Sequence, residues 1–147
     1  KLNFTLLVAG EFYTDKQKYL DLIDKYNLHD KIKLFTDFIP TEDVKYYFCA
    51  SDVVVLPYKD ATQSGIIQIA NNFNKPIIAT NVGGLGEVIK DGVNGYLRSP
   101  NNPNEIAQAI LQFYAENKEL EFSDKIKAEK DKYSWDNFIE NILSMVK

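Results

Sequence analysis

Apolar runs alternate with amphipathic segments along most of the chain. Five runs have the composition of β-strands, and they cover residues 3–10, 31–39, 52–58, 75–80 and 95–98. Helical patterns lie between and after them, over residues 14–28, from Thr41, over about 64–73, near 103–116 and again in the tail from about 121. Strands that alternate with helices predict right-handed crossovers and a parallel sheet with helices on both faces. The fold class that we expect is α/β and doubly wound.

The most continuous apolar run supports a parallel sheet. It reads DVVVLPY over residues 52–58 and has no polar residue from Val53 to Pro57. A strand that is buried on both faces has such a run, whereas a strand with one solvated face alternates. The length of 147 residues predicts one domain, 1–147, whose end from 117 to 147 forms a C-terminal helical tail.

Two of the predicted helices have recognisable starts. Thr14 and Gln17 have the spacing of a capping box at the helix over 14–28. Asn102, Pro103 and Glu105 supply an N-cap, a first-turn proline and a capping partner for the helix near 103–116. We expect both helices to begin at these residues.

Charge and composition narrow the function. The net charge of −4 and the pI of about 5.0 argue against nucleic acid as a partner, because phosphate backbones require a basic face. Cys49 is the single cysteine and His29 the single histidine, so neither an internal disulfide nor a structural zinc site is expected. Beside Phe48, Cys49 is expected in the core, and a chain so poor in cysteine fits a reducing compartment such as the cytoplasm. The sequence has no run of 18 apolar residues that would span a membrane.

Candidate chemistry lies where the predicted strands end, since ligands of open parallel sheets bind beyond the carboxyl ends of the strands. The turn KDATQSG, residues 59–65, leads from an apolar strand into a helix that starts at Ser64 and Gly65. The first turn of a helix presents amides without internal partners, a glycine leaves room for a phosphate, and a serine adds a donor. The alternative is that Ser64 is only an N-cap and Gly65 only a turn residue.

A second turn supports the hypothesis of a ligand site at this edge of the sheet. NVGGLGE, residues 81–87, has Gly83, Gly84 and Gly86 and ends at Glu87. Clustered glycines let the backbone approach a ligand or adopt positive φ; the alternative is a loop of unusual dihedrals with a solvated acid. Neither turn has the spacing of a dinucleotide-binding or P-loop motif.

Three pieces of the sequence carry a family resemblance. ASDVVVLPY, KPIIATNVGGLGEVI and DGVNGYL occur in this order, and the wider similarity covers roughly residues 3–115. The chain resembles the C-terminal, donor-binding domain of retaining GT-B glycosyltransferases of the group 1 type. The resemblance implies a Rossmann-like domain that binds a nucleotide-diphosphate sugar without metal or cofactor. An N-terminal domain would hold the acceptor, and the protein could associate peripherally with a membrane through that domain. The product would serve the assembly of cell-surface polysaccharide or glycolipid.

The resemblance also implies site residues. Ser64 and Gly65 would bind the donor diphosphate, and the turn with Gly83, Gly84 and Glu87 would face the sugar. The further residues implied are Gln63 at the sugar and Asp37, Phe38 and Ile39 at the base.

Two departures separate the chain from the family pattern. Positions where members commonly have two glutamates, at the sugar and at the ribose, are Ala61 and Ile69 here. Asp60, Thr62 or Gln63 could substitute for them. The family also places one more strand and helix, with an arginine and a lysine that clamp the diphosphate, before the strand at which this chain begins. That strand would lie in the middle of the sheet. Because the domain that holds the acceptor is also outside this sequence, we expect the chain alone to be inactive.

Two alternatives remain beside the glycosyltransferase. One is a non-catalytic relative that keeps the fold for binding or scaffolding, which Ala61 and Ile69 favour. The other is half of a sugar-nucleotide epimerase, which would need no acceptor. Assays of donor hydrolysis or transfer by the full-length protein identify a scaffold, and product analysis identifies an epimerase.

Overall fold

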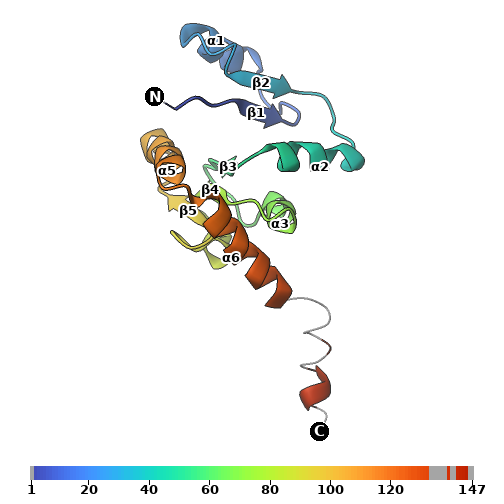
Figure 1. Ribbon diagram of the computed structural model, residues 1–147. Helices are drawn as coiled ribbons and strands as arrows, with labels where there is room; N and C mark the ends of the chain where they lie inside the picture. Colours follow the sequence, from blue (N-terminus) through green and yellow to red (C-terminus); the bar gives the residue numbers. More distant parts are fainter. Residues whose placement is uncertain (1, 133–138, 140–141, 146–147) are drawn as a thin grey trace. The chain divides into compact units, whose positions relative to one another are not determined.

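A computed structural model describes residues 2–132, 139 and 142–145 (Figure 1). The elements follow in the order β1 (Leu6–Ala9), α1 (Gln17–Lys25), β2 (Ile32–Phe35), α2 (Thr41–Ala50), β3 (Val54–Leu56), α3 (Gly65–Asn72), β4 (Ile77–Thr80), α4 (Leu85–Val88), β5 (Gly95–Arg98), α5 (Pro103–Ala115) and α6 (Lys118–Lys132). Every predicted strand is present: β5 has the predicted bounds, the other four strands are shorter than predicted, and every strand pair is parallel. The α/β class with a parallel, Rossmann-like arrangement is therefore confirmed.

The predicted C-terminal tail, 117–147, is described only in part. It contains α6, and residues 142–145 are also helical. Positions 133–138, 140–141 and 146–147 lie outside the described residues.

The chain forms two compact units, residues 1–50 and 51–147. In the first, β1 pairs with β2, with Leu6 opposite Ile32. In the second, β4 lies between β3 and β5. Among the described residues, β1 and β2 each pair on one side only, and so do the two outer strands of the other sheet, β3 and β5. The extra mid-sheet strand and the single domain stay predictions.

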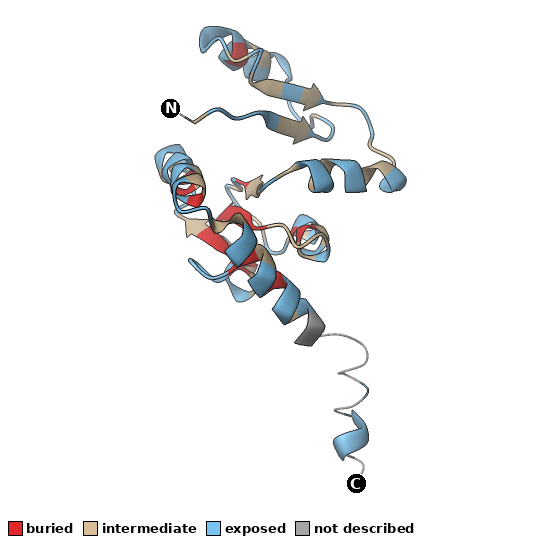
Figure 2. Cartoon of the chain, viewed as in Figure 1, coloured by how far each residue is buried: buried red, intermediate tan, exposed pale blue. Residues whose placement is uncertain are grey.

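The core of the second unit surrounds β4 (Figure 2). All four residues of β4 are buried, because strands flank it on both sides and helices pack on the sheet. Ile78 belongs to a cluster with Tyr96, Ile106, Ala109, Phe113 and Phe122. The rings of Tyr96 and Phe122 meet edge to face with their centroids 5.3 Å apart, which joins β5 to α6. The burial on both faces that the apolar run at 52–58 predicts is thus found more fully in β4 than in β3, where only Leu56 is fully buried.

The first unit has a smaller core. On α1 the buried residue is Ile23, whereas Tyr19, Leu22 and Tyr26 are each about half exposed or more. The 3.6-residue pattern therefore predicted the helix correctly but overstated how much of its apolar face is covered. Cys49 is exposed, so its predicted place in the core is wrong. It lies near the end of α2, a helix without a fully buried residue.

The two predicted helix starts had different outcomes. On α5 the Asn102 side chain accepts a hydrogen bond from the Glu105 amide at 3.4 Å, and Pro103 is the first helical residue, so this prediction is confirmed. On α1 the capping box is wrong, because the helix begins two residues later than Thr14 would allow. The Asp15 carboxylate accepts from the Gln17 amide at 3.0 Å, an Asx turn that takes the place of the box.

None of the described helices combines the length and the apolar character needed to cross a membrane.

Candidate functional site

The start of α3 is open to solvent. The Gly65 and Ile66 amides have no protein acceptor among the described residues. A Cβ atom at Gly65 would meet nothing within 4 Å, and both Gly65 and Ile66 are exposed. The first turn also has no acidic residue. The amides and the positive end of the helix dipole are therefore free to receive an anion.

Ser64 occupies the N-cap position of α3 without capping through its side chain. Its backbone is extended, with φ −138° and ψ 117°, and the Ile67 amide donates to the Ser64 carbonyl oxygen at 3.2 Å. The Ser64 Oγ instead lies 3.0 Å from the Tyr58 Oη. Ser64 is therefore the N-cap by position, as the alternative expected, but its side chain makes no capping hydrogen bond and instead contacts a tyrosine hydroxyl.

Tyr58 is itself held by the end of β4. The buried Thr80 hydroxyl donates to the Tyr58 carbonyl oxygen at 2.6 Å, and the Tyr58 amide donates to the Leu56 carbonyl oxygen at 2.9 Å. Sequence reasoning missed both Tyr58 and Thr80. The available signal was their position, since each follows or ends an apolar strand at the edge where the turns meet.

The glycine turn packs directly against the turn before α3. The Gly84 amide donates to the Thr62 carbonyl oxygen at 2.9 Å. Gly83 has φ +51°, and a Cβ there would collide with the carbonyl oxygens of Ala61 and Thr62. Gly83 is thus required both by its left-handed backbone and by the close approach of the two turns. This contact brings together the residues expected at the phosphate and at the sugar.

The polar side chains at this edge differ in accessibility. Gln63 and Glu87 are exposed, whereas Ser64 is half-buried. The Glu87 carboxylate lies close to Gly84, since a Cβ on that glycine would be 3.8 Å from Glu87 Oε2. Glu87 is in the short helix α4, whose start faces the turn. Gln63 and Glu87 therefore offer hydrogen-bonding groups to a ligand at this edge.

The two positions that depart from the family pattern provide no such group. Ala61 and Ile69 are half-buried aliphatic residues. The polar neighbours Asp60, Thr62 and Gln63 are all exposed.

The residues expected at the base lie in the first unit and line a pocket there. Asp37, Phe38 and Ile39 follow β2, and the pocket has a volume of about 280 Å³. Phe38 is 73% exposed, so an aromatic group could stack on its ring. The other lining residues are Leu34, Phe35, Thr36, Pro40, Asp43 and Tyr47.

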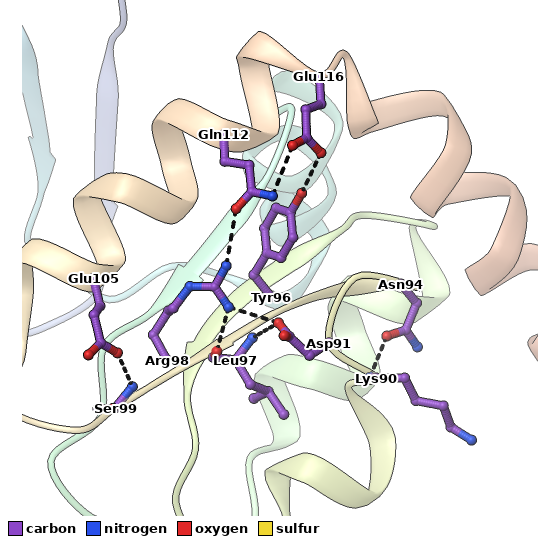
Figure 3. A network of polar contacts seen from close by, with 10 residues as sticks. All are labelled: Lys90, Asp91, Asn94, Tyr96, Leu97, Arg98, Ser99, Glu105, Gln112 and Glu116. Atoms are coloured by element: carbon purple, nitrogen blue, oxygen red, sulfur yellow. Dashed lines mark hydrogen bonds and ion pairs between the residues drawn. The ribbon is translucent and has the colours of Figure 1, made fainter.

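A network of polar contacts around β5 has a structural role (Figure 3). Arg98 forms an ion pair with Asp91 at 2.8 Å and a hydrogen bond with Gln112 at 3.3 Å, and its guanidinium lies over the Tyr96 ring. The Tyr96 hydroxyl donates a hydrogen bond to the Glu116 carboxylate. The pKa of Tyr96 is raised, first by burial and then by the negative charge of Glu116. The network joins β5 to α5 and involves none of the predicted site residues.

The described part of the chain contains no cluster of histidine, cysteine, aspartate or glutamate that could hold a metal ion. The expectation of a site without metal or cofactor stays a prediction, because it concerns the reaction and not the resting chain.

Comparisons with known proteins agree on the family. The family model described as "Glycosyl transferases group 1" matches residues 1–116. An uncharacterized glycosyltransferase of Methanocaldococcus jannaschii is 30% identical over 143 residues, which is 95% of this chain and 39% of that protein. The chain spans about two fifths of the length of the first curated relatives that it matches.

Solved structures show the same fold. The Anabaena HepE structure in complex with UDP-glucose has a TM-score of 0.76 at 20% identity, over 97% of this chain and 40% of that one. The C-terminal domain of a group 1 glycosyl transferase from Francisella tularensis has a TM-score of 0.71 at 23% identity, over 82% of this chain and 63% of that one. The chain therefore belongs to the group 1 glycosyl transferases, and it is a glycosyltransferase domain with a Rossmann-like α/β fold.

Proposed function

We propose that this chain is the donor-binding domain of a retaining glycosyltransferase and that the start of α3 binds the diphosphate of a nucleotide-diphosphate sugar. The observation that carries the proposal is the pair of unpartnered amides at Gly65 and Ile66, in a first turn without acids. Backbone amides at a helix start bind phosphate groups in many folds. In the reaction they would stabilise the negative charge that grows on the departing diphosphate.

The sugar would lie beside the same turn. Gln63, Gly83, Gly84 and Glu87 are the proposed contacts, with the exposed side chains of Gln63 and Glu87 as the hydrogen-bonding groups. The hydrogen bond from Gly84 to Thr62 supports this proposal, because it keeps the glycine turn against the loop that leads to Ser64.

Base recognition is a separate proposal for the first unit. The aromatic face of Phe38 and the backbone of Asp37 and Ile39 would hold the base in the pocket after β2. Its volume of about 280 Å³ lies just below the range of sites that hold whole small-molecule ligands, which suits one part of a ligand.

The activity of the whole protein is also a proposal. We infer an acceptor-binding N-terminal domain, a role in polysaccharide or glycolipid assembly, and a cytoplasmic location. The relatives' greater length supports a further domain, and the HepE complex with UDP-glucose supports a nucleotide sugar as donor.

A second candidate is a non-catalytic relative. Ala61 and Ile69 favour it, because neither side chain can hydrogen-bond a sugar or ribose hydroxyl. Such a protein would bind the nucleotide sugar without turning it over. Transfer or hydrolysis of the donor by the full-length protein distinguishes the two.

Titration of nucleotide-diphosphate sugars against Gly65→Glu and Gly65→Gln tests the proposed site. Both side chains fit at a position where a Cβ meets nothing, so both variants should fold. At roughly 6 Å from a phosphate charge, the added carboxylate costs about 3 kcal/mol at an effective dielectric of about 20. We expect Gly65→Glu to bind about 100-fold more weakly than Gly65→Gln in calorimetry. Equal affinities for the two variants would count against a diphosphate at this helix start.

A further inference from the structure

We infer that Tyr58 is a positioning residue, which directs the Ser64 hydroxyl toward the donor diphosphate. The inference rests on the proposed function of α3 and adds a residue that neither the family resemblance nor the sequence pattern assigned. Its basis is the 3.0 Å distance between Tyr58 Oη and Ser64 Oγ, two half-buried hydroxyls that lie six residues apart in the chain.

The pair leaves one hydroxyl proton unused. Between two hydroxyls, one proton forms the shared hydrogen bond and the other remains available. Neither hydroxyl has a further protein partner among the described residues. When an anion lies at the start of α3, the favourable direction has Tyr58 donating to Ser64 and Ser64 donating to a phosphate oxygen. Hydrogen bonds in such a chain polarise one another, so Ser64 becomes a stronger donor.

The same contact keeps Ser64 from competing with the ligand. A serine at an N-cap normally turns its oxygen toward the amide two or three residues ahead. Here the Ser64 side chain makes no cap hydrogen bond, and the first amides of α3 stay open. Without the tyrosine hydroxyl, Ser64 would be free to rotate and to accept from the Ile66 amide, which is one of the two amides that the anion needs.

The backbone around Tyr58 is rigid enough for this role. Thr80 is 2% exposed at the end of β4, and its hydroxyl donates to the Tyr58 carbonyl oxygen at 2.6 Å. This bond ties the residue after Pro57 to the central strand of the sheet. The tyrosine ring therefore extends from a fixed point toward the helix start.

A double-mutant cycle on Tyr58→Phe and Ser64→Ala tests the inference, with UDP and inorganic pyrophosphate as probes. We expect each single variant to lose about five- to tenfold in affinity for both probes, the effect of one hydrogen bond. The double variant should bind no more than twofold more weakly than Ser64→Ala, because Tyr58 acts through Ser64. Independent losses that multiply in the double variant would overturn the inference, since a purely structural role gives that result.

Two further variants separate the inference from the proposed function. Tyr26→Phe, at an exposed tyrosine of the first unit, should bind both probes like the unmodified protein. Gly65→Glu should weaken pyrophosphate binding about 100-fold if the diphosphate lies at α3. If Gly65→Glu weakens binding and Tyr58→Phe does not, only the role of Tyr58 is wrong. If neither variant changes binding, or neither probe binds, the proposed site is wrong and the role of Tyr58 falls with it.

Discussion

Alanine substitutions at three glycines measure how tightly the turn before α3 and the glycine turn are packed against each other. Gly65 has ordinary dihedrals and open space, Gly92 has φ +73° and open space, and Gly83 has φ +51° with two carbonyl oxygens in the way. The series therefore adds one physical effect at a time. Gly65→Ala adds a methyl group, Gly92→Ala adds backbone strain, and Gly83→Ala adds both strain and a collision.

The expected magnitudes follow from these differences. Gly65→Ala should be neutral or stabilise by up to about 1 kcal/mol, because alanine loses less entropy in a helix. Gly92→Ala should cost about 1–2 kcal/mol for a left-handed alanine. Gly83→Ala should cost about 3–4 kcal/mol in total. The same backbone strain is joined by the loss of the hydrogen bond from Gly84 to Thr62, worth about 1 kcal/mol, and by overpacking of about 1 kcal/mol or more from the collision.

Urea unfolding followed by circular dichroism gives the three free energies. Gly83→Ala should also weaken donor binding, because the displaced backbone leads directly to Ser64, whereas Gly92→Ala should bind normally. Equal destabilisation by Gly83→Ala and Gly92→Ala would refute the reasoning, since it would mean that the turns are not in close contact.

Three further predictions concern the second unit. Phe113→Ala should destabilise the protein by about 3–5 kcal/mol, because Phe113 is 1% exposed. The control Leu111→Ala, at a residue that is 54% exposed, should cost less than about 1 kcal/mol, and thermal unfolding measures both variants. Burial and then the hydrogen bond to Asp52 raise the pKa of Tyr114 to about 12. The contribution of Tyr114 to the free energy of unfolding should therefore be full below about pH 10 and fall as the pH rises toward 12. In Tyr114→Phe the loss of stability with rising pH should be smaller, and an unchanged loss would contradict this prediction. Asn102→Ala should cost about 1 kcal/mol through loss of the α5 cap, measured by urea unfolding, and no change would mean that the cap is dispensable.

Local patterns predicted much of the framework. The strand at 95–98 matches β5 residue for residue, and the α5 cap is formed as expected, because both depend on neighbouring residues in the chain. The predicted start of α1 was wrong because Asp15, which lies between Thr14 and Gln17, forms a tighter local turn. The prediction that Cys49 lies in the core was wrong because burial depends on which elements pack against a helix, and periodicity carries no information on that packing.

The candidate site was predictable in position but not in its contacts. Strand-to-helix turns at one sheet edge follow from the alternating pattern, so Ser64 and Gly65 could be singled out early. The contacts of Gly83 and Tyr58 could not, because each contact is with a residue that folding brings near. A cluster of glycines indicates close approach without saying whether a ligand or the neighbouring backbone is the partner.

The central claim is that the free amides at the start of α3 receive the diphosphate. Two-dimensional ¹H–¹⁵N NMR during a UDP titration measures those amides directly. We expect the Gly65 and Ile66 amide protons to move downfield and to saturate together, while uridine without phosphates leaves them unchanged. If UDP binds and these two resonances stay in place while amides elsewhere shift, the diphosphate lies at another position and the account is wrong.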